Sequence, residues 1–276
     1  MIRRKTISAA QHEPELRDGG VQSVDRALSI IETLAEDDEG YRLSDLAVRT
    51  GLSTSTVHRL LATLEKRRFV QFDRTESKWH IGAQSFSVGA TFARRRNFAA
   101  QAMPYLRKLR DQTRETANLA VVDDESIVLL VRAESREIMR SLTKVGGRVA
   151  MVASGVGQAV LATYADEDVN AIIRHHGMPR LTEKSIVRPS DLFRRLEIVR
   201  KQGYAVDDEE ACMGIRCVAA VVYSDCGEPL AAISVSGMTS RLTNDRLPLL
   251  GRVVRDVATE LTLALGGVLP DASGQG

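Results

Sequence analysis

Hydroxyl and basic side chains recur on one face of a helix that is predicted between Gly51 and Phe69. Apolar residues at i, i+3, i+4 and i+7 predict a buried opposite face, and Ser53 can cap the N-terminus of the helix. Small side chains allow a helix to enter a DNA major groove, arginine can pair with a guanine edge, and basic side chains hold phosphate. An ordinary solvated surface helix remains the alternative. The residues on this helix predicted to contact DNA are Ser53, Thr54, Ser55, Thr56, His58, Arg59 and Lys66.

The segments that precede this helix favour the DNA-binding interpretation. A first helix is predicted to begin at a Ser23 cap and to bury an apolar stripe that includes Val24 and Leu28. Ser44 is predicted to cap a short second helix, and Gly51 can adopt the left-handed conformation needed between two helices. This order of elements is that of a helix-turn-helix.

The segment that follows the helix is predicted to form a β-hairpin. Residues 69–72 and 78–81 alternate apolar and polar side chains around a polar tip. A hairpin beside a helix-turn-helix is a wing. Trp79 is predicted to anchor the core of this wing, and Arg74 is predicted to contact the DNA backbone or minor groove.

A second group of polar residues lies in the C-terminal part of the chain. Residues 154–157 form a glycine-containing turn at a predicted helix N-terminus, which favours a small anion. Ser234 and Ser236 are expected on the same side of one strand, and Cys217 lies across the predicted hairpin. These groups either line a small polar pocket or satisfy one another in a core. The acidic run 207–210 is expected to be a solvated loop.

An enzyme is the alternative class of function for this second group. A nucleophilic Cys217 would need a nearby base. His175 and His176 are adjacent, so they are expected to point in different directions on a helix, and the sequence has no HExxH pattern. Because nothing else specifies a reaction, we predict that the chain is not an enzyme and that it carries no cofactor and no metal.

Composition excludes several classes of protein. The 276 residues carry a formal net charge of +2, so any nucleic-acid footprint is local. Three cysteines without CxxC spacing argue against a disulfide framework or a zinc finger and fit a reducing compartment. The sequence contains neither an apolar run long enough to span a membrane nor the apolar region of a signal peptide. We therefore predict a cytoplasmic protein without a membrane partner.

The remaining pattern predicts the architecture. Helix, strands, helices, strands and helix follow one another, which is typical of an α+β fold with an antiparallel sheet covered by helices. Strands are expected at 118–122, 126–131, 137–143, 214–223 and 230–236. The predicted divisions are a disordered tail at 1–20, a winged helix-turn-helix domain at 21–82, a linker helix at 83–97, a second domain at 98–267 and a C-terminal tail at 268–276.

Several distant segments occur in an order that is typical of one protein family. They are VQSVDRAL at 21–28, GLS at 51–53, HRLL at 58–61, ASGVG at 153–157, GYAVDDEE at 203–210 and GIRC at 214–217. Through them the chain resembles IclR-family transcriptional regulators over nearly everything between residues 21 and 267. Segments 81–89 and 232–237 are similar to a branch of that family that responds to glyoxylate and pyruvate.

The resemblance implies a winged helix-turn-helix, a linker helix and a GAF-like effector-binding domain. It also implies a repressor that forms dimers, often paired into tetramers, on palindromic double-stranded operator DNA. The implied effector is a small 2-oxo acid, glyoxylate or pyruvate, whereas a regulator that senses an aromatic acid is the alternative within the family. Matching positions imply effector contacts at Gly155, Val156, Asp207, Cys217, Ser234 and Ser236, with side walls from Ser141, Val149 and Ile215.

Two positions depart from the glyoxylate-responsive branch. Ser141 is polar where a larger apolar residue is expected, and Val156 is bulkier than the expected alanine. Asp207 also presents an electrostatic conflict, because a carboxylate beside an anionic ligand is unfavourable unless it is protonated or offset by hydrogen bonds.

Overall fold

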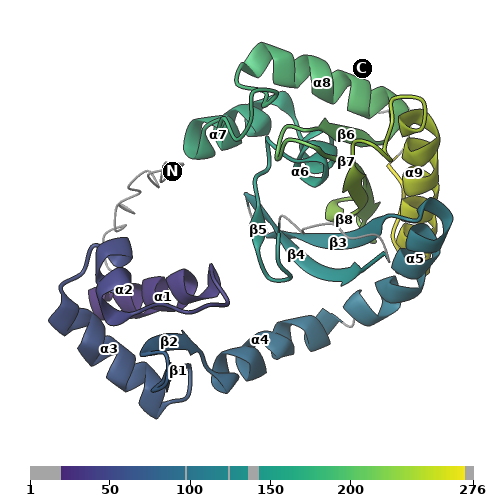
Figure 1. Ribbon diagram of the computed structural model, residues 1–276. Coiled ribbons are helices and arrows are strands. Elements are labelled where there is room, and N and C mark those ends of the chain that lie inside the picture. Colours follow the sequence, from purple (N-terminus) through teal and green to yellow (C-terminus); the bar gives the residue numbers. More distant parts are fainter. Residues whose placement is uncertain (1–19, 97, 124, 136–142, 271–276) are drawn as a thin grey trace. The chain divides into compact units, whose positions relative to one another are not determined.

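The computed structural model describes residues 20–96, 98–123, 125–135 and 143–270 (Figure 1). The chain forms two compact units, which divide after Phe92. Within the described ranges, no helix is both long and apolar enough to cross a membrane.

The first unit contains three helices and a two-stranded hairpin. Its elements are α1 (Gln22–Ala35), α2 (Leu43–Thr50), α3 (Thr54–Lys66), β1 (Val70–Asp73) and β2 (Lys78–Ile81). The strands pair antiparallel, with Phe72 opposite Trp79. All five elements contribute to one core, whose buried members include Ile30, Leu34, Leu46, Val57, Leu61, Val70 and Trp79. The predicted helix-turn-helix and hairpin are therefore confirmed.

The predicted caps of the first two helices were wrong. Ser23 and Ser44 lie inside the first turns of α1 and α2, and the cap positions are Val21 and Arg42, neither of which makes a side-chain capping hydrogen bond. The carbonyl oxygens of Val21 and Arg42 already accept the first backbone hydrogen bonds of the two helices. A serine two residues further on is therefore too late to cap the helix.

The apolar stripe of α1 is also only partly buried. Val24 and Leu28, which were expected in the core, are 55% and 53% exposed, whereas Ile30 and Leu34 are buried. The reason is that α2, α3 and β2 pack on the side of α1 that carries Ile30 and Leu34. Helical periodicity shows that an apolar stripe exists, but the packing partners decide which part of it is covered.

Helix α4 (Ala83–Arg96) follows the wing and contains the division between the two units. Its start is held by the first unit, because Ser85 Oγ donates to the Phe69 carbonyl at 2.8 Å. Phe86 and Val88 on this helix are 78% and 53% exposed.

The second unit is built on a six-stranded sheet in the order β5-β4-β3-β8-β7-β6 (Figure 1). Every pair of neighbouring strands is antiparallel. The strands are β3 (Thr116–Asp123), β4 (Ser126–Ala133), β5 (Arg148–Val149), β6 (Ala205–Asp208), β7 (Ile215–Tyr223) and β8 (Pro229–Met238). The helices are α5 (Phe98–Thr113), α6 (Gly155–Leu161), α7 (Asp166–His176), α8 (Pro189–Gln202) and α9 (Leu247–Ala264).

Helices cover both faces of this sheet. Leu119 and Ile233 pack in one apolar cluster with α5 and α9, whereas Ala120 and Ala232 pack in another with α6, α7 and α8. Successive residues of a strand thus enter opposite cores, as strand geometry requires. The predicted α+β class with an antiparallel sheet is confirmed.

Two details of the second unit differ from expectation. The short strands β5 and β6 were not predicted, and the expected strand at 137–143 falls, except for Thr143, outside the described residues. The acidic run at 207–210 is not a solvated loop, because Asp207 belongs to β6 and is 5% exposed, and Glu210 is 2% exposed. Arg195 Nη1 pairs with Glu210 at 3.0 Å, which offsets the cost of burying that charge.

Candidate functional site

The N-terminus of α3 is fixed by Ser53. Its backbone is extended, and its hydroxyl accepts a hydrogen bond from the Thr56 amide at 3.3 Å. Gly51 ends α2 in the left-handed region, at φ 67°, and so turns the chain before α3 begins. The predicted cap and glycine turn are confirmed, and the Ser53 hydroxyl positions the first turn of the helix.

Helix α3 has one buried and one exposed side. Val57 and Leu61 are 0% exposed. On the other side, Thr56 is half-buried and the remaining predicted DNA contacts are exposed, namely Thr54, Ser55, His58, Arg59 and Lys66. Among the described residues, no hydrogen bond or ion pair occupies the side chains of His58, Arg59 and Lys66. Exposed basic groups on a helix whose back is anchored in a core are what major-groove recognition requires.

The wing presents Arg74 at its tip. The rings of Phe72 and Trp79 pack with centroids 4.9 Å apart, and Trp79 is 8% exposed, which confirms its role as the anchor of the wing. Asp73 Oδ1 accepts from the Thr75 amide at 2.7 Å and closes the turn. The turn therefore leaves Arg74 exposed to solvent, where it can reach phosphate.

A pocket of about 100 Å³ lies in the second unit between the sheet and the N-terminus of α6. Eight of the nine residues predicted to contact an effector line it, namely Gly155, Val156, Asp207, Cys217, Ser234, Ser236, Val149 and Ile215. The ninth, Ser141, lies outside the described residues. The sheet register brings these positions together, with Asp207 opposite Cys217 and Cys217 opposite Ser236.

Gly155 begins α6 and permits its close approach to β7. A Cβ atom at this position would lie 3.2 Å from the Sγ and 3.3 Å from the carbonyl oxygen of Cys217. Ser154 caps the helix by accepting a hydrogen bond from the Gly157 amide at 3.1 Å. The first amides of a helix have no intrahelical acceptor, so those of Gly155 and Val156 are available to an acceptor in the pocket.

Two polar residues that the sequence analysis missed complete the pocket. The Asn118 amide donates to Ser236 Oγ at 3.3 Å and to Ser234 Oγ at 3.5 Å. The side-chain oxygen of Asn118, Oδ1, accepts from Arg132 Nε at 2.9 Å, and Arg132 Nη2 donates to the backbone carbonyl of Thr143 at 2.7 Å. These bonds hold a guanidinium group in the pocket wall. Burial lowers the pKa of Arg132, but an arginine side chain keeps its charge in proteins.

A signal for both missed residues was present in the sequence. Asn118 is a polar residue in an otherwise apolar predicted strand, and Arg132 directly follows the strand expected at 126–131. Buried polar side chains need partners. An asparagine inside an apolar strand therefore indicates either a hydrogen-bond network or a ligand.

Burial sets the protonation of two other pocket residues. It raises the pKa of Asp207 to about 7, although hydrogen bonds from the Glu210 and Ala211 amides act in the opposite direction. The pKa of the Cys217 thiol rises to about 11 because of burial and the nearby Asp207 charge. The thiol therefore stays protonated near neutral pH, which disfavours it as a nucleophile.

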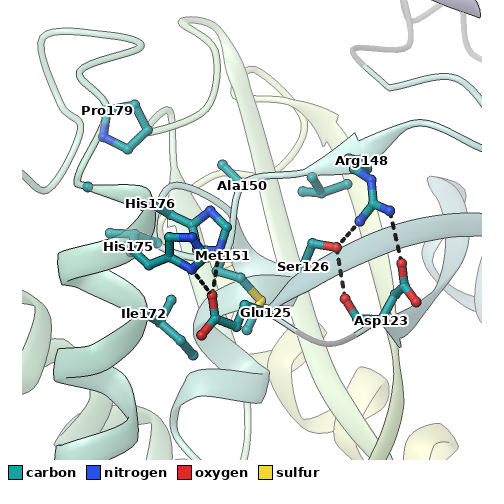
Figure 2. A pocket seen from close by; sticks show the side chains of 13 residues that line it. Asp123, Glu125, Ser126, Arg148, Ala150, Met151, Ile172, His175, His176 and Pro179 are labelled. Atoms are coloured by element: carbon teal, nitrogen blue, oxygen red, sulfur yellow. Dashed lines mark hydrogen bonds and ion pairs between the residues drawn. The ribbon is translucent and has the colours of Figure 1, made fainter. Parts of the chain in front are cut away.

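The histidines provide no base for Cys217 in the described pocket. None of the described residues that line it is a histidine. His175 and His176 line a different pocket, where both rings contact Glu125 (Figure 2). The expectation that these two rings point in different directions was wrong, because they lie at the C-terminal end of α7 and use different ring nitrogens.

Two family models match the chain. The model of the IclR helix-turn-helix domain matches residues 23–74, and that of the bacterial transcriptional regulator IclR C-terminal domain matches residues 90–263. The chain belongs to the IclR family. This IclR-family chain is 40% identical over 251 residues to the acetate operon repressor of Salmonella typhimurium. The matched residues cover 90% of this chain and 92% of that protein.

Further IclR-family proteins are similar along most of their length. The transcriptional repressor IclR of Escherichia coli is 40% identical over 252 residues, which cover 91% of this chain and 92% of that protein. The crystal structure of the Thermotoga maritima IclR matches with a TM-score of 0.69 and 25% identity, covering 88% of this chain and 98% of the other. The helix-turn-helix and the sheet-based unit thus both have counterparts in transcriptional regulators.

Proposed function

We propose that this protein is a ligand-responsive repressor that binds double-stranded operator DNA and a small 2-oxo acid, in particular glyoxylate. Residues 21–82 would bind DNA, 83–97 would form the linker helix, and 98–267 would bind the effector, between tails at 1–20 and 268–276. The names of the two 40% identical relatives support the repressor sense. We further propose a cytoplasmic protein that forms homodimers paired into tetramers.

The observation that carries the effector proposal is the polar lining of the pocket around the Arg132 guanidinium. A positive charge held beside hydroxyl groups and helix amides is suited to a carboxylate. Ser234 and Ser236 can donate to the same acid, because each hydroxyl rotates freely about its bond to carbon.

The size of the pocket supports a small acid over an aromatic one. The cavity volume is about 100 Å³, much less than the roughly 640 Å³ of the pocket beside His175. We expect a two- or three-carbon acid to match a cavity of this size better than the bulkier aromatic acid.

Asp207 would act as a hydrogen-bond donor to the bound acid. Because its pKa is raised to about 7 by burial, a substantial fraction of its side chains is protonated at neutral pH. An anionic ligand favours the protonated form still further. Protonation would relieve the electrostatic conflict noted in the sequence, since a neutral carboxyl group can donate to the ligand instead of repelling it.

An effector changes DNA affinity only if it binds one conformation of the protein better than another. Helix α4 contains the division between the two units. It is therefore the element whose conformation would couple the pocket to the DNA-binding unit.

Calorimetric titration of the purified full chain tests the effector proposal. Glyoxylate, pyruvate and benzoate are compared on the wild type, Ser234→Ala, Ser236→Ala and the control Ser240→Ala, which removes an exposed hydroxyl outside the pocket. A hydrogen bond to a charged group contributes about 1.5–3 kcal/mol, so we expect each pocket variant to bind glyoxylate at least about tenfold more weakly and the control to be unchanged. Saturable benzoate binding without glyoxylate binding would establish the aromatic alternative instead.

A further inference from the structure

Two histidines and a glutamate converge in the second unit, in an open pocket of about 640 Å³ (Figure 2). His175 Nδ1 lies 2.5 Å and His176 Nε2 lies 2.9 Å from the same oxygen of Glu125. Glu125 belongs to the β3–β4 turn, whereas the histidines end α7. Segments far apart in the sequence thus bring three potential ligand atoms within 4.8 Å of one another.

Neighbouring residues can share one partner here because they use different ring nitrogens. Nδ1 of His175 lies near its backbone, whereas Nε2 of His176 lies at the far end of the ring. The two ring centroids are 4.6 Å apart, with an angle of 36° between the planes. Gly177, at φ 70°, ends α7 directly after them.

We propose that Glu125, His175 and His176 form a binding site for a divalent transition-metal ion of the zinc class. Imidazole nitrogen and carboxylate oxygen are ligands that such ions prefer. The site is distinct from the effector pocket, because none of its three ligand residues lines that pocket.

The two distances from Glu125 to the histidine nitrogens require only a small adjustment to admit the ion. Zinc bonds of about 2.0–2.2 Å in a tetrahedral arrangement place the ligand atoms roughly 3.3 Å apart. The two nitrogen–oxygen distances of 2.5 and 2.9 Å must therefore lengthen by less than about 1 Å. The side chains can move, since those of His175 and His176 are 68% and 46% exposed.

The surroundings are suited to a cation. Glu125 directs one carboxylate oxygen at both histidine rings, so an oxygen ligand already lies between the two nitrogens. Met151 and Ile172, at 5% and 4% exposed, form the apolar floor beside the cluster. The Arg148 guanidinium in the same pocket is paired with Asp123 at 3.0 Å, so its charge is offset.

Three protein ligands leave a coordination position open to water or to a small ligand in the pocket. A site of this kind resembles zinc sites with an open position more than the closed four-ligand sites that hold a fold together. We therefore expect binding that is saturable but weaker than that of a closed structural site, and a folded protein in the absence of the metal.

Calorimetric titration of zinc chloride into the metal-free full chain tests the proposal. The variants are His175→Ala and His176→Ala, with Cys226→Ser as the matched control, because Cys226 is an exposed zinc-type ligand outside the cluster. We expect one ion per chain, binding weakened by about tenfold or more in each histidine variant, and unchanged binding in the control. Circular dichroism of the metal-free variants checks that these exposed replacements leave the fold intact.

Cobalt(II) provides a second, spectroscopic measurement. Nitrogen and oxygen ligands predict d–d absorption without a thiolate-to-cobalt charge-transfer band, and loss of that absorption in the histidine variants. Lack of saturable zinc binding by the wild type would overturn the proposal. So would wild-type affinity in both histidine variants, or a thiolate band that Cys226→Ser removes. These outcomes do not depend on effector or DNA binding, so the proposed repressor function stands or fails separately.

Discussion

Replacement of Asp207 with asparagine should remove a pH-dependent cost to the stability of the second unit. Burial raises the pKa of this carboxyl from 3.8 to about 7. Between these values the unfolded chain is ionised while the folded protein still holds the proton. The folded state therefore loses stability as the pH rises from about 4 to about 7, and above that range the cost stays constant.

The magnitude follows from the same pKa values. A difference of about three pH units corresponds to about 4 kcal/mol in total. Only the part above the starting pH is visible in an experiment. Between about pH 5.5 and about pH 8.5, the wild type should lose about 2 kcal/mol relative to Asp207→Asn. Asparagine keeps an oxygen that can accept from the Glu210 amide, which donates to Asp207 Oδ1 at 2.7 Å.

Urea unfolding at several pH values, without effector, measures this difference. The free energy of unfolding of the wild type is subtracted from that of Asp207→Asn at each pH, so that other titrating groups cancel. Asp245→Asn, which changes an exposed carboxylate, is the control. A difference for Asp207→Asn that varies with pH no more than that of the control would refute the conclusion that this carboxyl is protonated in the folded protein near neutral pH.

Three further predictions concern the DNA-binding helix, the wing and the pocket. In a salt-titrated DNA shift assay, Arg59→Ala should lose about 1–3 kcal/mol of discrimination between operator and random DNA. Lys66→Ala should weaken binding to operator and to random DNA alike and reduce the slope of the salt dependence by about one. Equal discrimination by Arg59→Ala and the wild type would contradict the assignment of Arg59 as a base contact. Trp79→Ala should destabilise the first unit by about 3–5 kcal/mol in urea unfolding, because a buried ring is lost, and a loss below about 1 kcal/mol would argue against its anchoring role. Gly155→Ala should weaken glyoxylate binding, since the added Cβ lies 3.2 Å from Cys217 Sγ; unchanged affinity in calorimetry would show that α6 can shift without cost.

Local sequence signals predicted the DNA-binding unit well. The Ser53 cap, the Gly51 turn and the alternation around Trp79 depend on interactions between residues close in the chain. Such signals failed where packing partners decide the outcome. Val24 and Leu28 fit a helical stripe, yet they are exposed because the neighbouring helices cover a different part of α1.

The effector pocket could be predicted only in part. The pattern of glycine, serine and cysteine residues, together with the family resemblance, indicated most of the lining. Asn118 and Arg132 were missed, although Asn118 contacts Ser236 across 118 positions of sequence. Strand pairing over that distance is not visible in local periodicity. The contact with Ser236 follows from the antiparallel pairing of β3 with β8.

The sequence determined the order of the longer helices and strands, the helix-turn-helix and the residue types available to bind an acid, because these depend on local spacing and composition. Tertiary structure decided the chemical state of those residues. Asp207 looked like part of a solvated acidic run, but the sheet buries it and raises its pKa to about 7. The rings of His175 and His176 were expected to point in different directions, but the β3–β4 turn brings Glu125 to both rings. Charge and coordination depend on neighbours in space, which are set only when distant segments pack together.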